Sequence, residues 1–194
     1  MRFYRPTWAE INLNNLAHNF RQVRRLLPAQ VKIMVTVKAD AYGHGLIPVS
    51  KRLVAEGVDF LGVASIDEGI ILRRAGINVP VLILGLILKQ DISPLFEYSL
   101  TPTVCDTAFA KALDAKARKT KVRLCVHLKI DTGMGRIGVL HEDAEGLIRN
   151  VAALTHIELT GLFTHFAFAD MDKKFTEHQI KLFNRLVVHL AKTG

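Results

Sequence analysis

The chain has 194 residues, of which 49% are hydrophobic, and these values allow one domain with a sizeable core. A formal net charge of +8 would suit a polyanion, but the basic residues are spread along the chain without interleaved aromatic residues. The longest apolar run, residues 79–88, is too short to span a bilayer. We therefore expect one globular domain with no nucleic-acid partner and no membrane partner.

The amino terminus and the cysteines bear on where the protein works. Residues 1–6 contain no apolar stretch of the kind that a secretory signal has. Cys105 and Cys125 do not have CxxC spacing, so they indicate neither a disulfide framework nor a zinc site. We expect both cysteines to be buried, in a protein of the reducing cytoplasm with no metal site.

Hydrophobic periodicity predicts a leading helix followed by six strand–helix units. The leading helix covers about residues 14–27 and ends at Pro28. Strands are predicted over residues 31–38, 60–64, 79–84, 101–104, 122–130 and 157–164. Helices are predicted over residues 46–56, 65–75, 91–98, 106–119, 142–154 and 174–192. No antiparallel hairpin is indicated, so the units predict a parallel sheet with right-handed crossovers.

This pattern leaves two parallel α/β architectures open, namely an open doubly wound sheet and a barrel. No GxGxxG motif follows the first strand, which weakens the dinucleotide-binding form of the open sheet. Six units are two fewer than a closed eight-stranded barrel requires. No domain boundary, repeat or low-complexity linker is visible, so residues 1–194 are expected to form one domain.

Lys38 lies where the first predicted strand meets a turn that contains Gly43 and Gly45. Parallel α/β proteins bind their ligands at the carboxyl ends of the strands. A lysine that loses solvation there can lower its pKa and condense with an aldehyde. Taken alone, a lysine at a strand end is an ordinary polar residue.

Longer motifs change that interpretation. Residues 38–45, K-A-D-A-Y-G-H-G, resemble the pyridoxal-phosphate attachment signature of the alanine racemases, although Thr36 stands where that family usually has an aliphatic residue. Residues 129–138, K-I-D-T-G-M-G-R-I-G, resemble the second signature of the family, and residues 5–11 resemble its opening strand. The resemblance covers the whole chain but only the first half or so of a family member. It implies an α/β, (β/α)8 TIM-barrel-like parallel barrel, here incomplete and without the C-terminal β domain.

The resemblance also implies roles for individual residues. Lys38 would hold pyridoxal 5'-phosphate covalently and, once released, act as the base on one face of the substrate. Tyr42 would donate to the cofactor phosphate, and Arg136 would contact the cofactor's phenolic oxygen and the substrate carboxylate. A carbamylated Lys129 would orient Arg136, and His165 would lie against the pyridine ring. No residue of the chain fits the second acid that inversion requires.

Other polar residues beside these motifs have structural explanations. Glu68 belongs to a capping-box pattern that begins at Ser65, so we assign it to helix capping rather than to acid–base chemistry. His44 lies between two glycines and is expected to be structural. Asp170 and Asp172 are expected in a loop and a helix cap because they have no metal-ligand partners at helical spacing.

The implied function is the interconversion of L-alanine and D-alanine for cell-wall synthesis, by a cytoplasmic enzyme that is a homodimer when full length. Residues 1–194 alone are expected to be inactive. Three alternatives remain: a non-catalytic barrel protein that carries pyridoxal phosphate, a related barrel decarboxylase, and a basic nucleic-acid-binding module. The two signatures together favour the racemase.

Overall fold

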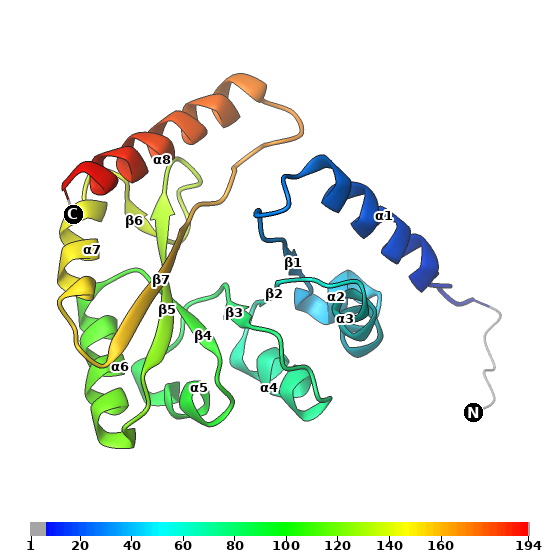
Figure 1. Ribbon diagram of the computed structural model, residues 1–194, viewed down its shortest axis with the longest axis horizontal. Helices are drawn as coiled ribbons and strands as arrows, with labels where there is room; N and C mark the ends of the chain where they lie inside the picture. Colours follow the sequence, from blue (N-terminus) through cyan, green and yellow to red (C-terminus); the bar gives the residue numbers. More distant parts are fainter. Residues whose placement is uncertain (1–6, 194) are drawn as a thin grey trace.

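The computed structural model describes residues 7–193 and contains one parallel β-sheet with helices packed against it (Figure 1). The opening strand that residues 5–11 were predicted to resemble lies partly outside the described residues, and residues 7–12 are not in a strand. A strand requires a hydrogen-bonding partner, and no described strand pairs with this segment. No helix within residues 7–193 combines the length and the hydropathy that crossing a bilayer requires.

The sheet has seven strands, and every described pairing between them is parallel. The strands are β1 (Met34–Thr36), β2 (Phe60–Val63), β3 (Val81–Ile83), β4 (Thr101–Val104), β5 (Leu124–Asp131), β6 (Val139–Leu140) and β7 (Ile157–Phe163). β1 to β5 lie side by side in sequence order, and β7 pairs with β5. Six strands match the predicted ones. β6 was not predicted, because a two-residue strand exists only through its pairing with Ile130 and Asp131 of β5.

The helices are α1 (Leu13–Leu26), α2 (Lys38–Gly43), α3 (Leu46–Ala55), α4 (Ile66–Arg74), α5 (Ser93–Glu97), α6 (Thr107–Thr120), α7 (Ala144–Ala152) and α8 (Lys173–Thr193), with a 3-10 turn at Lys89–Asp91. Seven of the helices match the predicted ones, and α2 was not predicted, because its residues were expected in a strand end and a turn. Ser65 and Asp106 cap α4 and α6 as predicted, since their side chains accept from the backbone N–H of Glu68 and Phe109. Asp172 likewise accepts from the N–H of Phe175 at the start of α8.

The two faces of β5 lie in different environments. Leu124, Val126, Leu128 and Ile130 are buried in the hydrophobic core. The alternate residues lie on the opposite face, where the ring of His127 is 5.8 Å from that of Phe60 and 6.5 Å from that of Phe163. Cys125 shares this face and is exposed, and Cys105 is half-buried, so the prediction that both cysteines are buried was wrong. Cys125 lies near the start of β5, whereas Lys129 and Asp131 near its end are buried on the same face.

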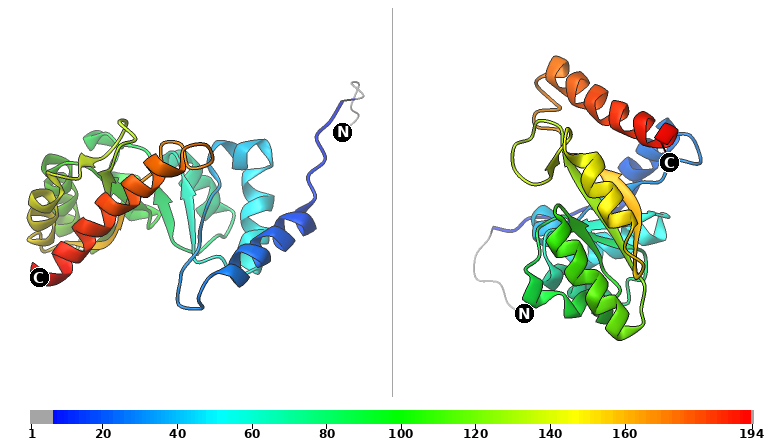
Figure 2. Two further views of the ribbon diagram at one scale, coloured as in Figure 1. Left: turned by 90° about the horizontal axis from the view of Figure 1, so that it is seen from above. Right: turned by 90° about the vertical axis from the view of Figure 1, so that its left-hand side faces the viewer.

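The barrel is incomplete in the described part of the chain. β1 pairs only with β2, and β7 pairs only with β5, so the two ends of the sheet do not meet. Figure 2 shows the chain progressing along the molecule, from α1 and α3 at the β1 end to α6 and α7 at the other end. This arrangement confirms the predicted parallel α/β architecture.

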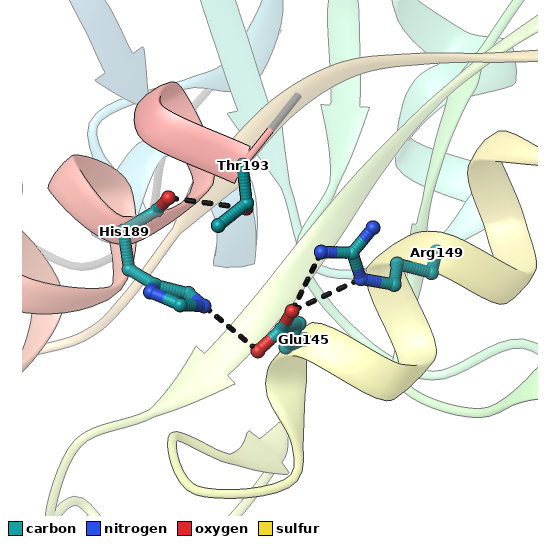
Figure 3. Close-up of polar contacts among 4 residues, drawn as sticks. All are labelled: Glu145, Arg149, His189 and Thr193. Atoms are coloured by element: carbon teal, nitrogen blue, oxygen red, sulfur yellow. Dashed lines mark hydrogen bonds and ion pairs between the residues drawn. The ribbon is translucent and has the colours of Figure 1, made fainter.

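α8 is attached to α7 by a surface carboxylate, and two of its own residues are buried in the fold. Glu145 of α7 accepts from the guanidinium of Arg149 at 2.8 and 3.0 Å and contacts His189 Nε2 of α8 at 3.0 Å (Figure 3). Leu186 of α8 is buried, and Gln179 is completely buried. α8 therefore lies over the carboxyl ends of β5 and β7, where the predicted site residues are.

Candidate functional site

The turn that carries Lys38 has an unusual backbone. β1 ends at Thr36, and Lys38 begins α2, in which residues 39–42 have φ angles of 51 to 55°. These are four consecutive non-glycine residues in the left-handed region, where an L-residue costs roughly 1–2 kcal/mol. The sequence predicted a turn made by Gly43 and Gly45. The structure shows that the left-handed conformation begins four residues before Gly43.

Hydrogen bonds hold this turn from both of its ends. The N–H of Ala41 donates to Val37 O at 2.8 Å, and the N–H of Gly45 donates to Asp40 O at 2.9 Å. The side chain of Asp40 accepts from Leu46 N at 2.6 Å and so caps the first turn of α3. The strained segment is therefore fixed between β1 and α3.

His44 contacts the carbonyl oxygens of the same turn. Its Nδ1 lies 2.9 Å from Ala41 O and 3.1 Å from Tyr42 O. This contact agrees with the structural role expected for His44, because the ring completes the hydrogen bonding of a turn that has few regular partners.

Glu68 reaches the Lys38 turn from α4. Its Oε1 accepts from Ala39 N at 2.6 Å, and its Oε2 accepts from Ala64 N at 2.7 Å. Its backbone N–H donates to Ser65 Oγ, as the capping pattern predicted, but its carboxylate does not close a capping box. The sequence did not predict this contact, because 29 residues separate Glu68 from Ala39 and no local pattern links them.

Lys129 lies on the face of β5 that also carries His127, opposite the core-facing residues of the strand. Only 4% of the surface of Lys129 is exposed. Its Nζ is 5.6 Å from the centroid of the Phe163 ring. Burial lowers the pKa of the Lys129 ammonium, and the positive charge of Arg136 lowers it further. Lys38 has the same effect to a smaller degree, which indicates that the three cations share one region.

The loop that carries Arg136 folds around the carboxylate of Asp131. Asp131 Oδ1 accepts from Gly133 N at 2.8 Å and from Gly135 N at 3.1 Å, and Oδ2 accepts from Arg136 N at 3.2 Å. Burial alone would raise the pKa of Asp131, but these backbone donors together lower it. Gly138 closes the loop against β5, where a Cβ would lie 2.8 Å from Asp131 N. The loop thus presents the exposed Arg136 at the end of β5.

His165 follows β7 on the same side of the sheet. Loss of solvation lowers the pKa of its imidazole, and the charges of Lys129, Arg136 and Lys38 lower it further. These effects favour the neutral ring over the imidazolium more strongly than in a free histidine.

Gln179 of α8 fixes the segment that carries His165. Its Nε2 donates to His165 O at 3.1 Å and to Thr132 Oγ1 at 3.2 Å, and its Oε1 accepts from Ala167 N at 3.0 Å. Thr132 also contacts Thr164 Oγ1 at 2.8 Å. The sequence did not predict a role for Gln179, because nothing in the pattern of α8 distinguishes a buried glutamine from an exposed one.

Four of the five predicted residues lie in one region: the charges of Lys38 and Arg136 lower the pKa of Lys129, and the charges of Lys129, Arg136 and Lys38 lower the pKa of His165. They come from the carboxyl ends of β1, β5 and β7. Tyr42 is exposed and lines a cavity of about 500 Å³ beside the start of α1, together with Asn12 and Val35. No hydrogen bond among the described residues links the Tyr42 hydroxyl to the other four.

The site has a surplus of positive charge. Within residues 7–193, no ion pair includes Lys38, Lys129 or Arg136. Lys38 and two neighbouring cations, Lys129 and Arg136, would attract a ligand that carries several negative charges. The amine also offers a nucleophile for a carbonyl group.

Comparison with known proteins assigns the family. The model of the alanine racemase N-terminal domain matches residues 11–194. This chain belongs to the alanine racemase family. It is 48% identical over 192 residues to the alanine racemase of Halothermothrix orenii, a match that covers 98% of this chain and 51% of that protein.

Solved structures of alanine racemases have the same fold. The alanine racemase of Clostridium difficile 630 in complex with cycloserine has a TM-score of 0.94 and 39% identity, and the match covers 100% of this chain and 54% of that one. The histidine racemase of Leuconostoc mesenteroides subsp. sake has a TM-score of 0.82 and 29% identity, with coverage of 90% and 47%. The chain therefore spans about half the length of the curated relatives it matches.

Proposed function

We propose that the protein is a pyridoxal-phosphate-dependent alanine racemase, and that residues 1–194 form its N-terminal, cofactor-binding barrel half. The observation that carries the proposal is the position of Lys38. It lies at the end of β1 in a strained turn, in a group of cations that also includes Lys129 and Arg136. Family membership supports the same reaction.

The residues of the site fit pyridoxal phosphate. The cofactor carries an aldehyde, a phenolic oxygen and a phosphate, and the site offers a lysine amine and unpaired cations. When bound, pyridoxal phosphate supplies an aldehyde that captures an amine and a conjugated ring that accepts the electron pair left when a neighbouring carbon loses its proton. Lys38 would hold the aldehyde carbon, and Tyr42 would donate to the phosphate. His165 would lie against the ring as a neutral group.

The reaction places two further demands on the chain. Lys38, once free, takes or returns the proton on one face of the substrate α-carbon. Arg136 holds the substrate carboxylate and the phenolic oxygen through its planar guanidinium, which suits two anionic oxygens. The opposite face needs a second acid, and we assign it to a part of the enzyme outside these 194 residues.

A carbamylated Lys129 completes the proposed site. Its lowered pKa favours the neutral amine, and only this form can attack carbon dioxide. The ammonium first releases one proton to solvent; the neutral nitrogen then bonds to the carbon of carbon dioxide while one C=O π bond breaks toward oxygen, and a second N–H proton leaves to solvent. A buried cation would thus become an anion that pairs with Arg136. Carbon-13 NMR in labelled bicarbonate should show a carbamate signal that is absent from the Lys129→Gln variant.

The remaining parts of the proposal concern the substrate, the assembly and the location. Alanine is the substrate that the named relatives indicate, and a homodimeric, cytoplasmic enzyme supplying D-alanine for cell-wall synthesis fits it. The histidine racemase has the same N-terminal fold, so we expect this half to serve amino acids with different side chains. Parallel assays with alanine and histidine would separate the two substrates.

The decisive experiment is to reduce the whole protein with borohydride in the presence of pyridoxal phosphate and to map the labelled peptide. We expect the label on Lys38, with Lys38→Arg as the unlabelled control. A label on another lysine with Lys38 free would contradict the proposal. A label on Lys38 with no turnover of any amino acid would favour the non-catalytic carrier instead.

A further inference from the structure

We infer that Glu68 is a positioning residue for Lys38: its carboxylate bridges the ends of β1 and β2 and holds the turn that presents the lysine amine to the cofactor aldehyde. This inference rests on the proposed function, since it assigns Lys38 the role stated there. It adds a residue that lies outside both family signatures.

The geometry of the bridge supports this role. One carboxylate oxygen accepts from Ala39 N at 2.6 Å, and the other accepts from Ala64 N at 2.7 Å. Ala39 is the residue after Lys38, and Ala64 is the residue after β2. Glu68 thus fixes the peptide unit that joins Lys38 to the rest of its turn. A carboxylate has two acceptor oxygens, so it can accept from two backbone N–H groups at once.

The strain of the turn explains why such a bridge is needed. Ala39 is the first of the four left-handed residues, with φ at 51°. A strained backbone persists only where surrounding contacts over-determine it, and such segments gather at functional sites. The other bonds of the turn come from Val37 and from residues 40–46, which lie within or beside it. β2 holds the residue before Lys38, because Val37 N donates to Gly62 O at 2.8 Å, and Glu68 holds the residue after it.

Helix capping does not account for the carboxylate. Ser65 already caps α4 by accepting from Glu68 N, and this bond uses only the backbone of Glu68. In a capping box the side chain would return to the N–H of Ser65, whereas here it binds Ala64 N and Ala39 N. Side-chain and backbone roles of Glu68 are therefore separable by mutation.

The test compares three variants of the whole protein: Glu68→Gln, Ser65→Ala and Asp67→Asn. Glu68→Gln has nearly the same shape, but its amide nitrogen would face a backbone N–H, so one of the two bonds is lost. Ser65→Ala removes the cap of α4 and leaves the carboxylate in place. Asp67 is an exposed neighbour in the same helical turn, which makes Asp67→Asn the matched charge control.

Two measurements report on the turn. The rate at which Lys38 captures pyridoxal phosphate, followed by borohydride trapping, should fall at least about tenfold in Glu68→Gln, since a charge-assisted hydrogen bond is lost. Hydrogen–deuterium exchange of the peptide spanning residues 38–45 in the cofactor-free protein should become faster in the same variant. Asp67→Asn should match the unsubstituted protein in both measurements. The thermal midpoint of unfolding of Glu68→Gln should stay close to that of the unsubstituted protein.

Each contrary result has a distinct meaning. Equal capture rates in Glu68→Gln and Asp67→Asn would overturn the inference and leave the proposed function standing. An equal fall in Ser65→Ala would show that Glu68 acts through the helix cap, which also overturns it. If Glu68→Gln does not fold, Glu68→Asp keeps the charge on a shorter side chain; capture at the unsubstituted rate would overturn the inference. No label on Lys38 in the unsubstituted protein would contradict the proposed function and this inference together.

Discussion

At the scale of single residues, the site combines the buried Lys129, the half-buried Lys38 and the exposed Arg136, and no ion pair within residues 7–193 includes any of the three. Lys129 is almost completely buried, and its pKa is lowered by burial and by Arg136. The pKa of His165 is lowered for the same physical reasons. Groups with shifted pKa values in one region are typical of functional sites, because burial and like charges are costly without a compensating role.

Arg136→Lys is expected to lower kcat/KM for alanine in the whole protein by about 10²-fold or more, because a lysine keeps the charge but loses the planar fork. Steady-state racemisation assays would measure it. Arg149→Lys is the matched control, since Arg149 is exposed on α7 and pairs with Glu145 rather than with a residue of the site. Unchanged kinetics for Arg136→Lys would place Arg136 outside the site.

The imidazole of His165 should titrate below its ordinary pKa of about 6.5 in the cofactor-free protein. Because the folded pKa is the lower one, the unfolded chain takes up this proton first as the pH falls. His165 therefore reduces stability as the pH drops below about 6.5, and the effect is complete below its folded pKa. NMR titration of the ring protons would report the pKa.

The Lys129→Gln variant supplies the control for that titration. In protein kept free of carbon dioxide, where Lys129 is not carbamylated, removing this neighbouring cation should raise the pKa of His165, because the charge of Lys129 contributes to the lowering. A His165 pKa at or above about 6.5 in both the unsubstituted protein and Lys129→Gln would contradict the electrostatic effect of Lys129 on His165.

At the scale of elements, α8 does more than cover the sheet. Gln179, completely buried in α8, bonds to the loop after β5 through Thr132 and to the segment after β7 through His165 and Ala167. One amide thus couples two site-bearing loops that are far apart in the sequence.

Gln179→Leu should lower the free energy of unfolding by about 1–3 kcal/mol or more, because it leaves buried donors and acceptors without partners. Denaturant unfolding would measure this loss, provided that the slope of the unfolding free energy against denaturant concentration is the same in both proteins. Lys181→Ala, at an exposed position on the same helix, should change stability by less than about 0.5 kcal/mol. Equal values for the two variants would show that the Gln179 bonds contribute nothing measurable.

At the scale of the whole molecule, the described sheet has two unpaired edges, at β1 and at β7. Unpaired strand edges expose backbone donors and acceptors that pair with other chains. The relatives are about twice as long as this chain, and the match lies in one half of each. The site at the carboxyl ends of the strands thus lies in a barrel whose ends do not meet.

Residues 1–194, purified alone, should aggregate or remain loosely packed and should not racemise alanine. The open edges and the missing second acid are independent reasons. Size-exclusion chromatography and a D-alanine assay with added pyridoxal phosphate would measure both properties. Robust turnover by a monodisperse sample would contradict this expectation and would mean that Tyr42 or His165 acts as the second acid.

Local sequence determined most of the secondary structure and the position of Lys38. Apolar alternation and capping residues such as Ser65 and Asp106 act over a few residues, so the pattern alone predicted six of the strands and the helices between them. The signature around Lys38 is also local. For this reason the sequence alone identified the family that the comparisons then confirmed.

Only the tertiary structure decided the features that depend on distant contacts. The left-handed turn consists of non-glycine residues and has no local signal, and β6 exists only through its pairing with β5. Glu68 and Gln179 act on residues 29 and up to 47 positions away, and their residue types are ordinary for helices. The physical reason is that a hydrogen bond between two elements depends on where the fold places both partners, and no periodicity within either element records that position.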